Sequence, residues 1–193
     1  MIIGITGGTG CGKTTALDVL RELGGVVIDC DAVYHTLLET DPALLASIEA
    51  RFPGTVKQGV LQRKKLGALV FSDPQALLDL NAITHTAVKL QVLRLLADSP
   101  ELVAIDAIGL FESGLAELCD VTVAITAPEN MRVQRLMARE GISEEYAKKR
   151  IAAQQSNGHY SALCHHTLEN SGSQEDFRAK CLAFFQSLDI MKP

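Results

Sequence analysis

The sequence lacks the features that mark secreted or membrane-spanning chains. Its cysteines are odd in number and include no C-x-x-C pair, which favours reduced thiols over a disulfide framework. They are Cys11, Cys30, Cys119, Cys164 and Cys181. No apolar run approaches the length that crosses a bilayer. The first residues carry no basic leader and no small-residue cleavage site, so we expect no secretory signal and a cytoplasmic location.

The chain also lacks an excess of basic charge. Its 193 residues carry a formal net charge of −5, which argues against a general nucleic-acid binder, because phosphate backbones attract basic surfaces. With 47 % hydrophobic and 21 % charged residues, and no internal repeat or long linker, the composition is that of one globular core. We expect no nucleic acid, no membrane and no obligate protein partner.

Short β-type runs alternate with helical patterns along the chain. The β-type runs cover residues 2–6, 26–29, 102–106, 121–126 and, more weakly, 166–169. Because apolar strands that alternate with helices pair in parallel between helical layers, this order predicts an α/β fold. We predict three layers, α/β/α, around a five-stranded parallel sheet.

The helical patterns are unevenly distributed between these strands. One helix, predicted at residues 14–23, joins the first two strands, whereas about seventy residues separate the second strand from the third. That is far more than a crossover needs, so we predict a helical insertion, with helices at residues 43–52 and 75–98. After the fourth strand, Thr126 and Glu129 have the spacing of a capping box.

The sequence GGTGCGKTT follows the first β-type run and contains the P-loop pattern. Its glycines let backbone N–H groups turn toward phosphates. The lysine reaches the β and γ oxygens, and the Thr14 hydroxyl is placed for Mg²⁺. The positive end of the following helix favours the same anion. We predict a nucleoside triphosphate site formed by Gly8, Gly10, Cys11, Gly12, Lys13, Thr14 and Thr15.

The thiol inside this loop allows two interpretations. A cysteine beside a lysine and a helix N-terminus is expected to have a lowered pKa and to be reactive. Alternatively, the loop needs a small side chain at position 11, and cysteine is small. We favour the second interpretation for Cys11.

Two classes of P-loop protein fit the pattern. DAIG, which begins at Asp106, is similar to the D-x-x-G of GTPase-like switches, but no N-K-x-D for guanine occurs. Small-molecule kinases combine a core with an acceptor-binding insertion and a basic lid, which suits the long insertion and the arginines after the fourth strand. Arg132, Arg135 and Arg139 share a broad helical face. We favour a kinase, with Arg139 as the charge-stabilising residue.

Several segments resemble the dephospho-coenzyme A kinase family, in order and spacing, over nearly the whole chain. They are IGITGGTGCGKTT, VIDCDAVYH, GVLQRKKLGALVF, LNAITHTAV, LFESGL, CDVTVAITAPENMRVQRLMAREGIS, RIAAQ and LENSG. The resemblance implies transfer of the γ-phosphoryl group of ATP, with Mg²⁺, to the ribose 3′-hydroxyl of dephospho-coenzyme A, the last step of coenzyme A biosynthesis. The alternatives are a kinase of another nucleoside, nucleotide or small metabolite, and, less favoured, a GTPase-like switch.

The acceptor hydroxyl needs a group that takes its proton, and we predict Asp31 for this role. We expect Asp31 at the carboxyl end of the strand beside the P-loop, where open α/β sheets bind ligands. If the strand continues through this stretch, Cys30 faces away from Asp29 and Asp31, which disfavours a metal site there. We expect Asp29 to be structural.

The remaining site residues each have two interpretations. If the family pattern transfers, Arg63 and His85 contact the acceptor, although a histidine near the core also suits a structural role. Asp106 either binds substrate and holds a Mg²⁺-bound water, or caps a turn. We predict catalytic roles for Asp31, Lys13 and Arg139.

The predicted organisation is a single P-loop kinase domain in three parts. Its core comprises residues 1–30, 100–127 and 165–193. The helical acceptor-binding insertion is predicted at residues 31–99, and the helical lid at residues 128–164.

Overall fold

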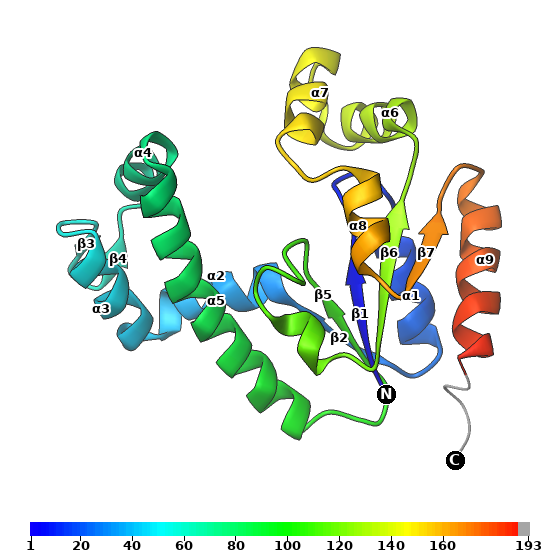
Figure 1. Ribbon diagram of the computed structural model, residues 1–193, viewed down its shortest axis with the longest axis horizontal. Helices are drawn as coiled ribbons and strands as arrows, with labels where there is room; N and C mark the ends of the chain where they lie inside the picture. The colour runs from blue at the N-terminus through cyan, green and yellow to red at the C-terminus, as the bar shows by residue number, and fades with distance from the viewer. Residues whose placement is uncertain (189–193) are drawn as a thin grey trace. The chain divides into compact units, whose positions relative to one another are not determined.

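The computed structural model describes residues 1–188, which divide into two compact units (Figure 1). Among these residues, the first unit contains Met1–Ile28, Ser99–Phe111 and residues 115–188, and the second contains Asp29–Asp98 and Glu112–Gly114. The predicted roles of insertion and lid stay predictions.

The sheet contains five strands in the order β2-β5-β1-β6-β7. They are β1 (Ile2–Thr6), β2 (Val26–Asp29), β5 (Val103–Asp106), β6 (Val121–Thr126) and β7 (His166–Glu169). β1 pairs in parallel with β5 and β6, and β6 pairs in parallel with β7. The predicted α/β fold with a five-stranded parallel sheet is confirmed. β5 lies between β2 and β1, so β2 is not the neighbour of the P-loop strand in the sheet.

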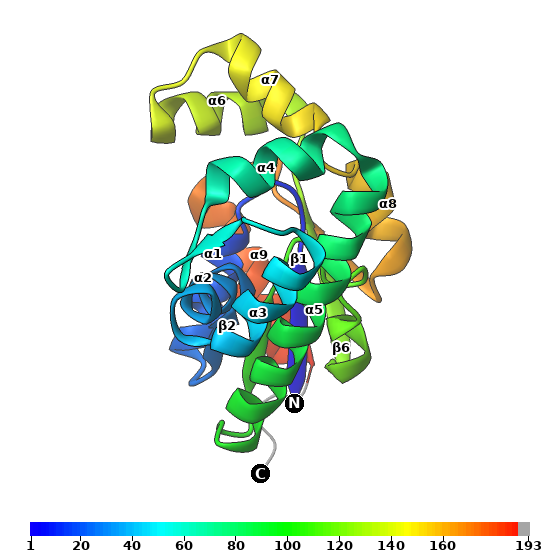
Figure 2. The same cartoon turned by 90° about the vertical axis from the view of Figure 1, so that its left-hand side faces the viewer.

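Helices cover both faces of this sheet. Successive strand residues point to opposite faces, and Ile3 to Thr6 of β1 are all buried, so both faces are covered there. Ile3 and Ile5 pack against α1 (Lys13–Glu22) and α9 (Gln174–Ser187) in the main core. On the other face, an added Cβ at Gly4 would lie 2.8 Å from the Sγ of Cys119. The short helix η1 (Leu115–Leu118) and α8 (Asn157–Leu163) belong to that layer, as Figure 2 shows for α8.

The helices α6 (Glu129–Glu140) and α7 (Glu144–Ala152) form a pair with a small apolar core of their own. Gly141 ends α6 with a φ of 66°, and the Ser143 side chain caps α7. The residue before α6 is Pro128, without a capping side chain. The predicted capping box of Thr126 and Glu129 is therefore wrong, because Thr126 is still part of β6.

The second unit is helical, as predicted, and also contains a short hairpin that was not predicted. Its elements are α2 (Cys30–Thr40), α3 (Pro42–Arg51), β3 (Val56–Lys57), β4 (Val60–Leu61), α4 (Arg63–Ser72) and α5 (Pro74–Ala97). The long helix α5 packs against α2, α3 and α4. Glu49 closes the hairpin by accepting hydrogen bonds from the backbone N–H groups of Gly54 and Val56. Across residues 1–188, no helix combines the length and the apolar character that a membrane span requires.

The stretch around Asp31 folds differently from the prediction. The side chain of Asp29 accepts a hydrogen bond from the N–H of Ala32 over 3.0 Å and so caps α2, which is the structural role expected of it. Because this cap starts the helix at Cys30, both Cys30 and Asp31 lie in the first helical turn. The prediction that Asp31 ends a strand is therefore wrong.

Candidate active site

The P-loop joins β1 to α1 and depends on glycine at defined positions. Gly7, Gly10 and Gly12 have φ values of 138°, 78° and 99°, a backbone conformation that strains residues with a Cβ. Close approach adds a second requirement. An added Cβ would lie 2.1 Å from the carbonyl oxygen of Ile125 at Gly7, and 2.3 Å from the Nδ2 of Asn170 at Gly12. The glycine spacing of the sequence is therefore required by both conformation and space.

A pocket of about 220 Å³ lies over this loop. It is lined by Gly8, Thr9, Gly10, Gly12, Lys13, Thr14, Asp106, Ile108, Arg135 and Arg139. All of these residues belong to the first unit. The lining includes three cationic side chains and one carboxylate, so the pocket suits an anion. This pocket therefore brings together six predicted site residues from the loop and the sheet edge. It also includes Arg139, the predicted charge-stabilising residue.

The start of α1 faces this pocket. Gly12 is the capping residue of α1 and has no side chain to accept hydrogen bonds from the first turn. The N–H groups of that turn can therefore bind an anion. The Nζ of Lys13 donates a hydrogen bond to the carbonyl oxygen of Gly7 over 2.9 Å, which holds the ammonium group against the loop.

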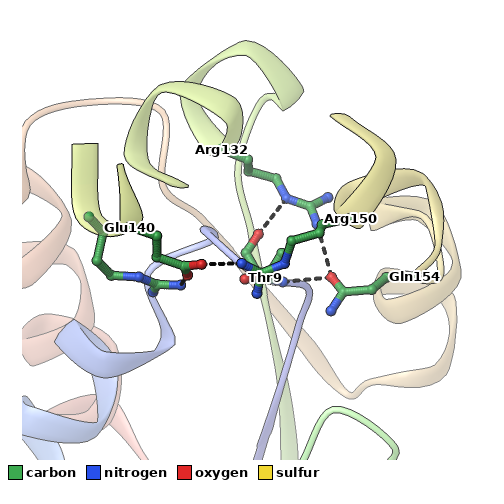
Figure 3. A network of polar contacts seen from close by, with 6 residues as sticks. Thr9, Arg132, Glu140, Arg150 and Gln154 are labelled. Carbon is green, nitrogen blue, oxygen red and sulfur yellow. Dashed lines mark hydrogen bonds and ion pairs between the residues drawn. The ribbon is translucent and has the colours of Figure 1, made fainter. Parts of the chain in front are cut away.

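Two arginines of α6 contact the outer part of the loop, and Figure 3 shows the contact of Arg132. Arg132 is only 3 % exposed, and its Nε donates to the carbonyl oxygen of Thr9 over 2.9 Å. Arg135 donates through Nη1 to the carbonyl oxygen of Gly10 over 3.3 Å. The helix that carries the predicted catalytic arginine is thus bonded to the P-loop backbone.

Arg139 has a different environment from these two. Its side chain is 59 % exposed and pairs with Glu140, with 2.5 Å between Nη2 and Oε1. Glu140 also pairs with Arg150, as Figure 3 shows. Hydrogen bonds from Arg139 and then from Arg150 lower the pKa of the Glu140 carboxyl. Arg139 therefore lines the pocket from an exposed position, held by one carboxylate.

Cys11 is fully buried beneath the loop. Burial raises the pKa of its thiol, although the charges of Arg132 and Lys13 act in the opposite direction. The interpretation of Cys11 as a reactive thiol with a lowered pKa is therefore wrong, and a small buried side chain is what the loop contains. Cys11 and Thr15 contribute to the loop from outside the pocket lining.

Three predicted site residues lie in the second unit. Asp31 and Arg63 are exposed, in the first turns of α2 and α4, and His85 is half-buried on α5. Arg63 is close enough to Tyr34 to lower the pKa of its hydroxyl, although burial has the larger effect and raises that pKa. Asp31 and Tyr34 are three residues apart on the same helix and so share a face.

A family model for dephospho-CoA kinase matches residues 1–176. The chain belongs to the dephospho-CoA kinase family.

The chain is similar to individual proteins over most of its length. A dephospho-CoA kinase of Anaeromyxobacter dehalogenans is 38 % identical, over 93 % of this chain and 88 % of its own. A solved Thermus thermophilus protein is 35 % identical with a TM-score of 0.79, covering 100 % of this chain and 98 % of its own. The solved dephospho-CoA kinase of Campylobacter jejuni is 25 % identical with a TM-score of 0.68, covering 97 % and 96 %.

The family assignment settles the class of reaction. The chain is a dephospho-CoA kinase family enzyme that phosphorylates dephospho-CoA in coenzyme A biosynthesis, with ATP as co-substrate. This confirms the kinase prediction over the GTPase-like switch.

The kinase also contains site residues that sequence reasoning missed. Gln154 accepts a hydrogen bond from the N–H of Thr9 over 2.8 Å, and Asn170 donates to the carbonyl oxygen of Cys11 over 3.0 Å. They come from the segments RIAAQ and LENSG, which resemble the family, but the amide side chain of each carries no charge and no nucleophile that suggests chemistry. The resemblance of those segments was the available signal.

Proposed function

We propose that this kinase transfers the γ-phosphoryl group of ATP to the ribose 3′-hydroxyl of dephospho-CoA, with the P-loop pocket as the phosphate site. The observation that supports the proposal is the convergence of Lys13, Arg135 and Arg139 on one pocket at the N-terminus of α1. In phosphoryl transfer the transition state spreads negative charge over the equatorial oxygens, so positioning and charge stabilisation supply most of the catalysis.

The donor site consists of the loop and the start of α1. Gly8, Gly10, Gly12 and Thr14 line the pocket. Cys11 and Thr15 complete the proposed donor site by closing the same turn, since their N–H groups donate to the carbonyl oxygens of Gly8 and Gly12. When phosphates enter, the ammonium group of Lys13 exchanges the carbonyl oxygen of Gly7 for phosphate oxygens. This exchange replaces a neutral acceptor by an anionic one, and charge-assisted hydrogen bonds are the stronger kind.

The pocket also fits Mg²⁺. Thr14 and Asp106 bring a hydroxyl and a carboxylate to the same lining, and hard oxygen donors of this type suit Mg²⁺. We propose that Thr14 holds the ion and that Asp106 orients a water in its shell. When bound, Mg²⁺ would neutralise charge on the transferring phosphate groups.

Arg139 is the proposed charge-stabilising residue. Because its guanidinium is exposed and its ion-pair partner among residues 1–188 is Glu140, it can turn from that carboxylate to the phosphoryl group that is being transferred. Glu140 retains Arg150 as a second partner in that event. The turn of Arg139 over the pocket also excludes water, which would otherwise hydrolyse ATP.

Residues of the second unit complete the proposal on the acceptor side. Asp31 accepts the proton of the 3′-hydroxyl, and Arg63 and His85 bind dephospho-CoA. The exposed carboxylate of Asp31 is accessible to a substrate hydroxyl, and a general base has to come within about 3 Å of the proton that it takes. Support for these three roles comes from the family resemblance. The five cysteines, all within residues 1–188, form no disulfide, which suits the reducing cytoplasm in which we expect the enzyme to act.

The position of the new phosphate group tests this proposal. The product made from dephospho-CoA and ATP is isolated, and its ribose is examined by phosphorus-coupled proton NMR. We expect phosphorus coupling at the 3′ carbon-bound proton, together with one ADP for each product molecule. A product phosphorylated at the 2′-hydroxyl or at any other position would contradict the proposal.

A further inference from the structure

Thr9 has both of its backbone polar groups bonded to side chains from the region that follows β6. Its carbonyl oxygen accepts from the Nε of Arg132 over 2.9 Å, and its N–H donates to the Oε1 of Gln154 over 2.8 Å. The Nη2 of Arg132 also approaches the same Oε1 atom, at 3.4 Å. The three residues therefore form a closed ring of hydrogen bonds, which Figure 3 shows. In this ring Gln154 acts only as an acceptor.

A second ring lies one step further along the loop. Asn170 is 4 % exposed, and its Oδ1 accepts from the Nη2 of Arg135 over 2.9 Å. Its Nδ2 donates to the carbonyl oxygen of Cys11 over 3.0 Å, while Nη1 of Arg135 donates to the carbonyl oxygen of Gly10. Asn170 therefore has to act as donor and acceptor at once.

The two rings share one design. Arg132 and Arg135 are three residues apart on α6, so they lie on one face of the helix. Each guanidinium bonds a carbonyl of the loop, and a side-chain amide then bonds both that arginine and the loop backbone. A buried guanidinium that loses its acceptor is costly, and so is a buried carbonyl that loses its donor. Both rings are therefore sensitive to the chemical nature of the amide.

We propose that Gln154 and Asn170 are positioning residues for the ATP phosphates, which act by holding residues 9–11 of the P-loop against α6. Neither has to touch the nucleotide. Each fixes backbone groups next to the glycines that turn their N–H groups toward the phosphates. This inference rests on the proposed role of the P-loop as the phosphate site. It adds that α6 is linked to the loop through Arg132 and Arg135, while Arg139 remains available for the reaction.

Two isosteric substitutions should have different effects, because Gln154 only accepts hydrogen bonds in its ring whereas Asn170 also donates one. Gln154→Glu replaces an acceptor by a better acceptor, because a carboxylate oxygen receives both the N–H of Thr9 and the guanidinium of Arg132. Asn170→Asp keeps the acceptor for Arg135 but turns a carboxylate oxygen toward the carbonyl oxygen of Cys11, where a donor is needed. A role in packing alone would tolerate both substitutions, since the shapes are the same.

The test compares four variants of the full chain by steady-state kinetics: Gln154→Glu, Gln154→Met, Asn170→Asp and, as a matched control, Gln155→Met. Gln155 is the exposed neighbour of Gln154. ATP is varied at saturating dephospho-CoA, and dephospho-CoA at saturating ATP. We expect Gln154→Met and Asn170→Asp to raise the KM for ATP by roughly 10- to 100-fold, the effect of one buried polar group left without its partner. We expect the KM for dephospho-CoA to change by less than about threefold in every variant. The KM for ATP should rise less in Gln154→Glu than in Gln154→Met, and Gln155→Met should resemble the parent.

Amide hydrogen exchange supplies a readout that needs no activity. The N–H of Thr9 loses its acceptor in Gln154→Met but keeps it in Gln154→Glu, so exchange at Thr9 should accelerate only in the first. This pair keeps the inference testable if Asn170→Asp does not fold. Equal damage from Gln154→Glu and Gln154→Met would overturn it, as would parental KM for ATP in Gln154→Met. A different phosphorylation position in the product would contradict the proposed function while leaving these exchange rates unaffected.

Discussion

The ammonium group of Lys13 lies 2.9 Å from the carbonyl oxygen of Gly7 and donates a hydrogen bond to it. The two residues are the lysine and the first glycine of the P-loop pattern, so the loop provides a partner for its own cation. Because that partner is neutral, the anionic oxygens of a nucleotide form a stronger hydrogen bond with the same ammonium group and can displace it. The loop therefore holds Lys13 in place before the nucleotide binds. Both the loop and Lys13 are predicted to bind the phosphates of that nucleotide.

Replacing Lys13 by Met should remove this cation while keeping an apolar stem of similar length. We expect kcat/KM for ATP to fall by at least about 100-fold, the loss typical of one preorganised group that stabilises transition-state charge. Steady-state ADP release measures the effect. Lys149→Met is the control, because Lys149 is exposed and paired with Glu145. A fall of less than about fivefold in Lys13→Met would remove Lys13 from the phosphate site.

Asp31→Asn tests the proposed base. An amide keeps the size of the side chain but does not accept the hydroxyl proton, so we expect kcat to fall by about 10²- to 10⁴-fold. ATP affinity, measured by calorimetry without acceptor, should stay within about threefold of the parent. Glu39→Gln on the same helix is the control, since Glu39 is also exposed. Near-normal turnover of Asp31→Asn would exclude Asp31 as the base.

Arg139→Ala should lower kcat by at least tenfold and by up to roughly 10³- to 10⁵-fold, the range for a charge-stabilising arginine. Loss of this side chain should also raise the ratio of ATP hydrolysis to phosphoryl transfer, since water is excluded less well. Both quantities come from parallel assays of ADP and product. Arg178→Ala, which removes an exposed arginine paired with Glu22, serves as the control. A change of only a few-fold in kcat would show that Arg139 is a surface residue.

Burial of Cys181 in the main core predicts a pH effect on stability. Burial raises the pKa of this thiol from 9.0 to about 12. The folded state therefore keeps its proton at a pH where the unfolded chain releases it. The resulting stabilisation is complete below pH 9 and is lost between about pH 9 and pH 12. We expect the free energy of unfolding to fall less steeply from pH 9 to pH 11 in Cys181→Ala than in the parent, as measured by urea denaturation. Equal slopes would contradict the prediction.

The strands and the phosphate loop were predictable because short-range patterns determine them. Four of the five sheet strands have the predicted bounds. The remaining strand, β5, begins at Val103, one residue later than predicted. The P-loop pattern needs glycine for local backbone reasons, as the φ values of Gly7 and Gly12 show. In both cases the signal and its cause lie within a few residues of each other.

One local helix cap and several features that depend on distant contacts were missed or misassigned. The helix at Cys30 starts early because Asp29 bonds the N–H of Ala32, a choice that an alternating pattern does not reveal. The strand order, with β5 next to β1, is set by the whole sheet. Gln154 and Asn170 act across more than 140 residues of sequence, and an amide has no charge that draws attention to it.

The most direct test of the account is acceptor-dependent ADP release by the purified full chain. ATP is supplied with dephospho-CoA, with nucleosides, with nucleoside monophosphates, or with no acceptor, and GTP without acceptor is run in parallel. We expect ADP release that depends on dephospho-CoA, and only background nucleotide release in the other reactions. Turnover with a nucleoside but not with dephospho-CoA, or GTP hydrolysis without any acceptor, would contradict it.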